Sequence, residues 1–230
     1  VDFTLKKGEI HALMGENGAG KSTLIKVLTG VEEFETGEIM IDGCDHAIIN
    51  RSPQEAQNRG ISTVYQEVNL CPNLTVAENL FIGREPRKGG LIDWKTMNKK
   101  ASKLLQDLDI HADVTQTIDN YSIAIQQMVA IARAVDMSAK VLILDEPTSQ
   151  LDPIAASDFL ETVKKINRDL GTTIILTEHR LEEVFPSADR VVVMDEGQIL
   201  CVGTPPEIGE ELKKRNHEMF LAMPVPMQVY

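Results

Sequence analysis

The sequence is poor in aromatic side chains and cysteines, and it has no long apolar run. Aromatic residues make up only 4% of its 230 residues. The cysteines Cys44, Cys71 and Cys201 lie far apart and lack metal-ligand spacing. We therefore interpret them as reduced thiols and expect no zinc site. The longest apolar strings, such as residues 141–144, are far shorter than the roughly 18 residues of a membrane span. We predict that the chain itself does not cross a bilayer.

Basic side chains are also scarce, with 23 lysines and arginines against 35 aspartates and glutamates and a formal charge of -12. This balance argues against a basic nucleic-acid-binding surface, so we expect no nucleic-acid partner. It does not argue against a small anionic ligand, because backbone N–H groups at a helix N-terminus bind phosphate whatever the net charge. Hydrophobic residues at 43% and charged residues at 25% are typical of a folded globular chain.

Short apolar, β-branched runs alternate with helical patterns along the chain, which predicts an α/β fold with a mostly parallel core sheet. The helices are predicted to begin near capping residues. A strand entering a turn over 39–43 and a hairpin over 195–202 predict some antiparallel pairing. The stretch 68–118 is helix-rich and lacks strand signals, so we expect a helical subdomain there. The predicted core strands are 10–14, 61–65, 141–144, 173–176 and 191–194, and the predicted caps are Ser52, Thr75, Asp93, Ser122 and Asp152.

A complete G-x-x-x-x-G-K-[ST] loop follows the first predicted strand and precedes a helix, which is the context of a phosphate-binding P-loop. Its glycines let N–H groups surround phosphates, Lys21 reaches the β- and γ-phosphates, and Ser22 ligates Mg²⁺. A merely structural glycine-rich turn is disfavoured by the full match. The predicted binding residues are Gly15, Glu16, Asn17, Gly18, Ala19, Gly20, Lys21, Ser22 and the following Thr23.

Two carboxylates end a second buried strand, in the run Val-Leu-Ile-Leu-Asp-Glu over 141–146. Ligands bind at the carboxyl edge of open α/β sheets, so Asp145 is placed beside the P-loop. We expect Asp145 to hold Mg²⁺ and Glu146 to orient and polarise the attacking water. A solvated acidic turn before Pro147 is the alternative interpretation of this pair.

Together with Gln66, the segment 149–152 and His179, these motifs resemble the nucleotide-binding domains of ABC transporters over nearly the whole chain. The resemblance implies an ABC-type P-loop NTPase, with a RecA-like core over 1–67 and 138–230 and a helical subdomain over 68–137. It also implies that Gln66 senses Mg²⁺ and the membrane subunit. Asp152 then belongs to a loop that communicates across a dimer, and His179 contacts the γ-phosphate.

The same resemblance implies the cofactors and partners. ATP and Mg²⁺ are bound between two such domains, in a homo- or heterodimer, and each site is completed by the partner's signature segment. Separate transmembrane permease subunits complete the importer, and the chain acts in the cytoplasm at the inner face of the cell membrane. Catalytic roles fall to Lys21, Glu146 and His179, and the metal site to Ser22, Gln66 and Asp145.

The signature segment, residues 121–127, departs from the family's Leu-Ser-x-Gly-Gln pattern. Ser122 is present, but Ala124 stands where glycine allows close approach to a phosphate. Ser122 is expected to offer its hydroxyl to a phosphate held by the partner domain. We therefore predict a weakened half of a shared site.

The two ends of the chain raise further expectations. No residue precedes Val1, so we expect a fragment that lacks a leader and the family's adenine-stacking aromatic residue. Phe3 is predicted to lie in the next strand and to pack in the core. Residues 2–152 resemble the first cassette of a monosaccharide importer, whereas 172–230 resemble energy-coupling-factor vitamin importer ATPases. A recombinant or engineered chimera is the hypothesis that accounts for both.

The sequence therefore predicts a Mg-dependent ATPase subunit that powers an ABC importer for a sugar or a vitamin-like solute. One alternative is an isolated or engineered domain with a weakened or vestigial site. Another is a soluble non-transport ABC ATPase, which would carry a second cassette, zinc-spaced cysteines or a basic nucleic-acid face.

Overall fold

A computed structural model describes residues 1–41, 47–66, 69–178 and 184–222. Its central sheet has six strands in the order β2-β5-β6-β1-β7-β8. The neighbours from β2 to β7 pair in parallel, and β7 pairs with β8 in antiparallel. The strands are β1 (Ile10–Met14), β2 (Ile61–Val64), β5 (Val141–Asp145), β6 (Thr173–Thr177), β7 (Arg190–Asp195) and β8 (Gln198–Gly203).

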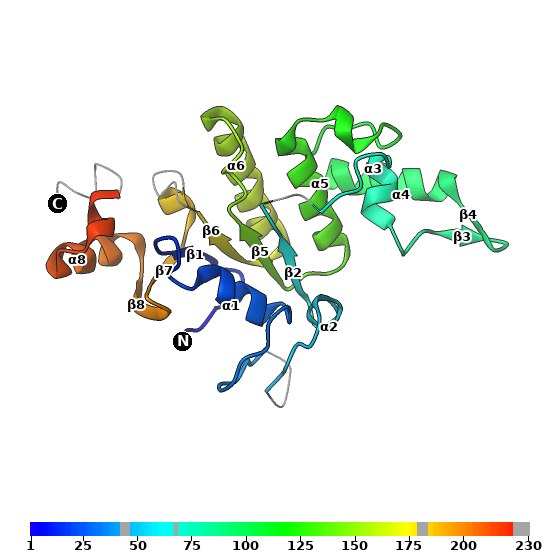
Figure 1. Cartoon of the computed structure of the whole chain (residues 1–230). Helices are drawn as coiled ribbons and strands as arrows, with labels where there is room; N and C mark the ends of the chain where they lie inside the picture. The colour runs from blue at the N-terminus through cyan, green and yellow to red at the C-terminus, as the bar shows by residue number, and fades with distance from the viewer. Residues whose placement is uncertain (42–46, 67–68, 179–183, 223–230) are drawn as a thin grey trace.

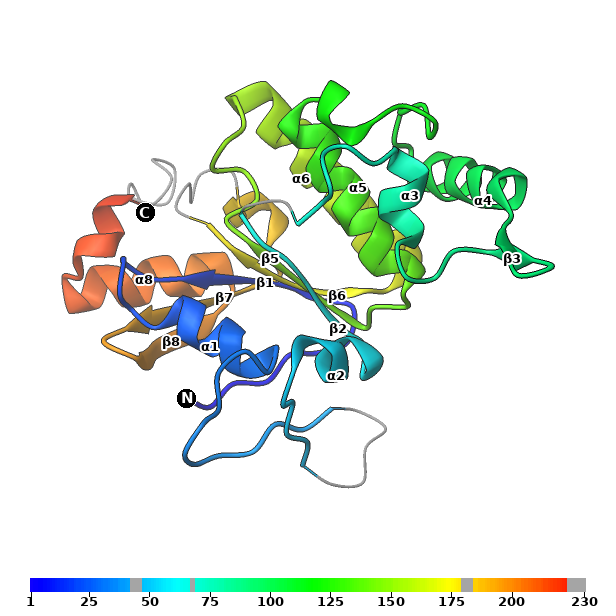
Figure 2. The ribbon, with the colours of Figure 1, turned by 45° about the vertical axis from the view of Figure 1, so that its right-hand side comes forward.

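Helices cover both faces of this sheet, as Figures 1 and 2 show from two directions. Most of them begin at the residues expected from the sequence. Among the described residues, the α-helices are α1 (Lys21–Leu28), α2 (Pro53–Asn58), α3 (Val76–Phe81), α4 (Trp94–Asp107), α5 (Ile123–Asp136), α6 (Pro153–Leu170) and α8 (Pro205–Arg215). The same described ranges contain the short 3-10 helices η1 (Ile118–Asn120), η2 (Phe185–Ser187) and η3 (Glu218–Ala222).

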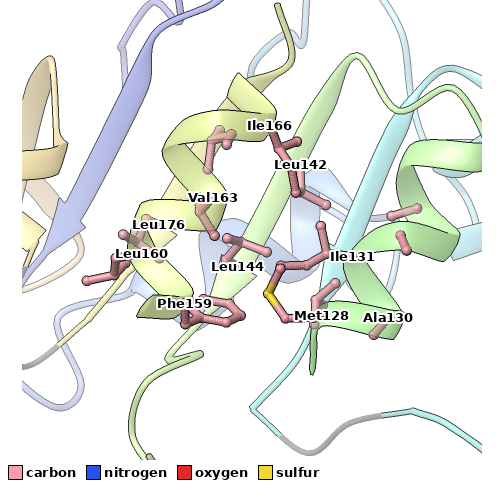
Figure 3. Packing of buried hydrophobic residues seen from close by; sticks show 14 of the residues in the cluster. Met128, Ala130, Ile131, Leu142, Leu144, Phe159, Leu160, Val163, Ile166 and Leu176 are labelled. Carbon is pink, nitrogen blue, oxygen red and sulfur yellow. The ribbon is translucent and has the colours of Figure 1, made fainter. Parts of the chain in front are cut away.

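Successive strand residues point to opposite faces, and this alternation builds two apolar layers. In β5, Leu142 and Leu144 pack with α5 and α6, while Ile143 packs with α1 and α2 on the other face. All three are fully buried. Figure 3 shows the first layer, where Phe159 and Val163 of α6 lie against β5. A sheet buried on both faces explains why its strands read as unbroken apolar runs.

Three expectations about strands were wrong. Residues 39–43 form no strand in the part that is described, because only Ile39 makes a single bridge to Ile48 and Gly37, at φ +122°, bends the preceding chain. Phe3 lies in irregular chain, although it packs against the second apolar layer as expected.

The stretch 68–118 does contain strands, β3 (Arg87–Lys88) and β4 (Leu91–Ile92), which pair as a hairpin. Gly89 and Gly90 connect them at φ +60° and +85°, a two-residue turn that glycine favours. The strands are too short to show an alternating pattern. Within the described residues, no helix is long and apolar enough to cross a membrane.

Candidate functional site

Three neighbouring parallel strands end at the same edge of the sheet and carry polar groups there. The glycine-rich loop follows β1, Asp145 is the last residue of β5, and Thr177 is the last residue of β6, which lies between them. Asp145 and Thr177 are paired in the β5–β6 register. The carboxyl edge is where open α/β sheets bind ligands.

The loop over 15–20 is held from behind by the turn between β7 and β8. Gly197 donates its N–H to the Ala19 carbonyl over 3.0 Å. A Cβ on Gly15 would lie 2.5 Å from the Met194 carbonyl oxygen, so glycine is required by space. Gly20, at φ +97°, is required by backbone conformation. The loop is therefore rigidly seated on the sheet.

Lys21 is the buried cation of this site, with only 6% of its surface exposed. Its ammonium group donates to the carbonyl oxygens of Gly15 at 2.6 Å and Glu16 at 3.1 Å. Burial lowers the pKa of Lys21, while the charges of Glu146 and Asp145 act in the opposite direction. Lys21 therefore lies close enough to both carboxylates for their charges to stabilise its ammonium group.

Thr177 joins the two carboxylate residues. Its hydroxyl donates to Asp145 Oδ1 over 2.7 Å and accepts the Glu146 N–H at 3.0 Å. Glu146 has φ +48°, so the chain leaves the strand here and the strict alternation of side chains ends. Thr177 is fully buried. It is a positioning residue that we had not expected, although a polar residue ending an apolar strand was a readable signal.

A second buried contact fixes the loop after Glu146. Glu178 is 4% exposed, and its Oε1 accepts the Thr148 N–H at 2.6 Å. Ser149 donates its hydroxyl to the Glu146 carbonyl over 2.8 Å. His179, the expected γ-phosphate contact, lies outside the described residues.

Helix α8 has a capping box, in which Glu207 Oε2 accepts the Thr204 N–H at 2.7 Å. The N-termini of the other described α-helices divide into two kinds. Those of α2, α3, α4 and α6 are capped by the side chains of Ser52, Thr75, Asp93 and Asp152. Those of α1 and α5 have no side-chain cap hydrogen bond. The first N–H groups of a helix have no partner within the helix, so uncapped ends are free to meet an anion.

Ser122 is the N-cap residue of α5, as expected, but its side chain makes no capping hydrogen bond, which corrects that part of the expectation. Its side chain is exposed, and solvent satisfies an exposed hydroxyl without a bond back to the helix. Ala124, two residues later, is partly buried and packs against the apolar core.

The remaining expected site residues lie at the surface. Gln66 is exposed and follows β2, next to β5 at the carboxyl edge. Asp152 is exposed and accepts the N–H groups of Ile154 and Ala155, both at 3.0 Å. Glu16, Asn17, Gly18, Ser22 and Thr23 are exposed, whereas Gly15 and Ala19 are buried.

The donor set around Ser22 and Asp145 suits a magnesium ion held with a nucleotide. Among the described residues, no group of three or more histidine, cysteine or acidic side chains could hold a metal alone. Mg²⁺ needs no such cage, since it keeps several waters and binds through one or two carboxylates plus phosphate oxygens. A hydroxyl and a carboxylate beside the loop fit that pattern.

Comparisons with known proteins identify the family of this chain. The family model described as ABC transporter matches residues 1–149. The galactofuranose transporter ATP-binding protein YtfR of Escherichia coli K12 is 48% identical over 200 residues, covering 87% of this chain and 39% of YtfR. The solved structure of cbiO1 from Clostridium perfringens, part of the ABC transporter complex cbiONQ, matches with a TM-score of 0.78 at 28% identity. That match covers 100% of this chain and 90% of cbiO1.

A ribose import ATP-binding protein, RbsA of Geobacillus kaustophilus, is 41% identical over 231 residues and covers 100% of this chain and 45% of RbsA. One relative thus accounts for both ends, which gives the chimera hypothesis no support. The chain spans less than half the length of these two curated relatives. The matched family model and the P-loop fold lead to one conclusion: this chain belongs to the ABC transporter family.

Proposed function

We propose that this chain binds and hydrolyses ATP with Mg²⁺ and powers an ABC importer for a small sugar. The observation that carries the proposal is the position of Asp145 and Glu146 at the sheet edge that bears the P-loop, near enough for their charges to act on Lys21. Two relatives named for galactofuranose transport and ribose import favour a sugar over a vitamin-like solute.

The residues divide the chemistry among themselves. The loop N–H groups and Lys21 bind the phosphates, and Lys21 exchanges its bonds to its own loop for bonds to phosphate oxygens. Ser22, Asp145 and Gln66 hold Mg²⁺, which supplies charge neutralisation on the β- and γ-phosphates. Glu146 orients the attacking water and accepts its proton, and His179 supports the γ-phosphate.

The proposed partners follow from the N-terminus of α5, which has no side-chain cap. The uncapped end of α5 faces solvent, which supports pairing with a second nucleotide-binding domain whose ATP it completes. Permease subunits on separate chains carry the solute, and the complex works at the cytoplasmic face of the membrane. Residues 68–137 form the helical subdomain, and Asp152 signals across the dimer.

Calorimetry and an ATPase assay test this proposal together. MgATP should bind with 1:1 stoichiometry, and the specific ATPase rate should rise with protein concentration because turnover needs a dimer. Absence of binding at millimolar nucleotide would identify a vestigial site, and a rate per chain that is independent of concentration would remove the shared-site mechanism.

A further inference from the structure

Basic side chains are concentrated in one segment of this acidic protein. Residues 84–103 carry seven lysines and arginines and only two acidic residues, although the whole chain has a formal charge of -12. The segment comprises the β3–β4 hairpin and the first part of α4. This segment is thus strongly positive.

Six of these cations have no ion-pair partner in the described part of the chain. They are exposed, and their positions span the hairpin and about two and a half turns of helix. They are Arg87, Lys88, Lys95, Lys99, Lys100 and Lys103, which we call the basic face.

Some basic residues elsewhere are paired. Lys165 lies 3.2 Å from Asp109, and Arg168 lies 3.1 Å from Asp169. Arg84, at the edge of the basic face, binds Asp136 over 2.7 Å. What distinguishes the six unpaired cations is their concentration in one segment that has only two acidic residues.

The two acids within the segment are already occupied. Glu85 accepts the Gly83 N–H at 2.8 Å, and Asp93 accepts from the backbone and hydroxyl of Thr96. Bonds from Thr96 lower the pKa of Asp93 most, and the charges of Lys88 and Lys95 lower it further. Glu85 and Asp93 therefore accept hydrogen bonds from their own loop and helix cap, and neither forms an ion pair with a cation of the basic face.

Two large apolar side chains lie exposed in the same segment. Leu91 in β4 is 77% exposed, and Trp94 at the start of α4 is 51% exposed. The platform beneath them is rigid, since Met97 and Ala101 of α4 are completely buried. Figures 1 and 2 both show the hairpin at an outer edge of the molecule, away from the central sheet.

We propose that the β3–β4 hairpin and the basic face bind an anionic lipid bilayer. Lysine and arginine meet phosphate headgroups, and tryptophan and leucine enter the interface between headgroups and acyl chains. A projecting hairpin with an apolar tip suits a flat surface. The contact adds direct lipid binding to attachment through permease subunits and uses none of the nucleotide-binding residues.

The single tryptophan of the chain reports this contact directly. The 230-residue chain is mixed with phosphatidylglycerol-rich vesicles and with pure phosphatidylcholine vesicles, and the emission of Trp94 is recorded. We expect a blue shift only with the anionic vesicles. It should reverse at about 1 M salt, where the Debye length falls to about 3 Å. An unchanged emission, or an equal shift with neutral vesicles, would overturn the proposal.

A charge-matched pair of variants locates the contact. Replacing Lys95, Lys99 and Lys103 by Gln should lower the fraction of protein floating with anionic vesicles at least about tenfold. Replacing Lys165, Arg168 and Lys214 by Gln removes the same charge from paired residues and should leave flotation unchanged. Circular dichroism checks that both variants are folded, so the result does not depend on the proposed function.

A soluble acidic polymer separates lipid from protein as the occupant. Poly-glutamate should leave the emission of Trp94 where it is, because it offers no apolar interface to enter. A blue shift with poly-glutamate and none with vesicles would assign the face to an acidic protein and contradict the lipid contact.

Discussion

Helices α1 and α5 both begin without a side-chain cap, yet their first turns have very different surroundings. At α1 the loop over 15–20 folds over the helix end, and Lys21 is buried beside two carboxylates. At α5 the first residues, Ser122 and Ile123, are exposed. From this difference we infer that the end of α1 is a nearly complete phosphate site and that the end of α5 needs a surface from outside this chain.

The largest effect should come from removing the cation at α1. Lys21→Ala should weaken MgATP binding at least about a hundredfold, because two charge-assisted hydrogen bonds to phosphate are lost. Lys26→Ala is the control on the same helix, since Lys26 is exposed and pairs with Glu32. Calorimetry should find the control within about twofold of the parent chain. Equal weakening in both variants would remove the special role of Lys21.

The next variant separates nucleotide binding from hydrolysis at the site beside α1. Glu146→Gln keeps the shape of the side chain but cannot accept a proton, so turnover should fall by about 100-fold or more. Binding of MgATP should persist, because the P-loop contacts are unchanged. Single-turnover assays beside calorimetry measure the two quantities, and a variant with full turnover would exclude Glu146 as the catalytic residue.

The third variant replaces Ala124 of α5 by the glycine that the family's signature pattern has at this position. Ala124→Gly should raise the ATPase rate at high protein concentration, because a phosphate held by a partner can approach the backbone more closely. The variant should also lose about 1 kcal/mol of unfolding free energy, since glycine is a poor helix former and the packed methyl is lost.

Ala130→Gly provides the matched control for that gain. Ala130 lies farther along α5 and is buried, so its replacement should destabilise the chain without raising turnover. Urea denaturation and the concentration-dependent ATPase assay separate the two effects. A rise in rate for both variants would point to loosened packing instead of a phosphate contact.

Two serines at helix N-termini test whether a capped and an uncapped helix end differ in stability. Ser52 accepts the Glu55 N–H at 3.2 Å, so Ser52→Ala should cost about 1 kcal/mol of unfolding free energy. The side chain of Ser122 makes no capping hydrogen bond, and Ser122→Ala should change stability by less than about 0.5 kcal/mol. If urea denaturation gave Ser122→Ala the larger loss, the hydroxyl would be structural.

The smallest effect concerns pH and the capped helix α4. The pKa of Asp93 lies below its ordinary value of 3.8, chiefly because Thr96 donates to it. Its stabilisation is therefore present above that value and is lost as pH falls through the lower folded pKa. Asp93→Asn should be less stable than the parent at pH 7, and the two chains should converge in urea midpoints toward pH 2. A constant difference between them would exclude ionisation as the cause.

Much of this molecule was predictable because its signals are local. The glycine-rich loop, the apolar strands and the caps at Ser52 and Asp152 depend on neighbouring residues, and each lies where the sequence placed it. Thr177 was missed because its partners Asp145 and Glu146 come from another strand, so only the β5–β6 register brings them together.

The other failures also have physical causes. The free hydroxyl of Ser122 has the same sequence signature as a true cap, and only the surrounding geometry distinguishes the two. The hairpin of β3 and β4 has strands too short for an alternating pattern, although its Gly89-Gly90 turn was a usable signal.

Mixing two inactive chains tests most directly whether α1 and α5 are halves of one site. Lys21→Ala disables the α1 half, and Ser122→Glu places a carboxylate in the α5 half, where it repels the partner's phosphate. An equal mixture should recover about a quarter of the parent ATPase rate, since half of random dimers are mixed and each keeps one intact site. A rate equal to the mean of the two variants alone would contradict the shared site.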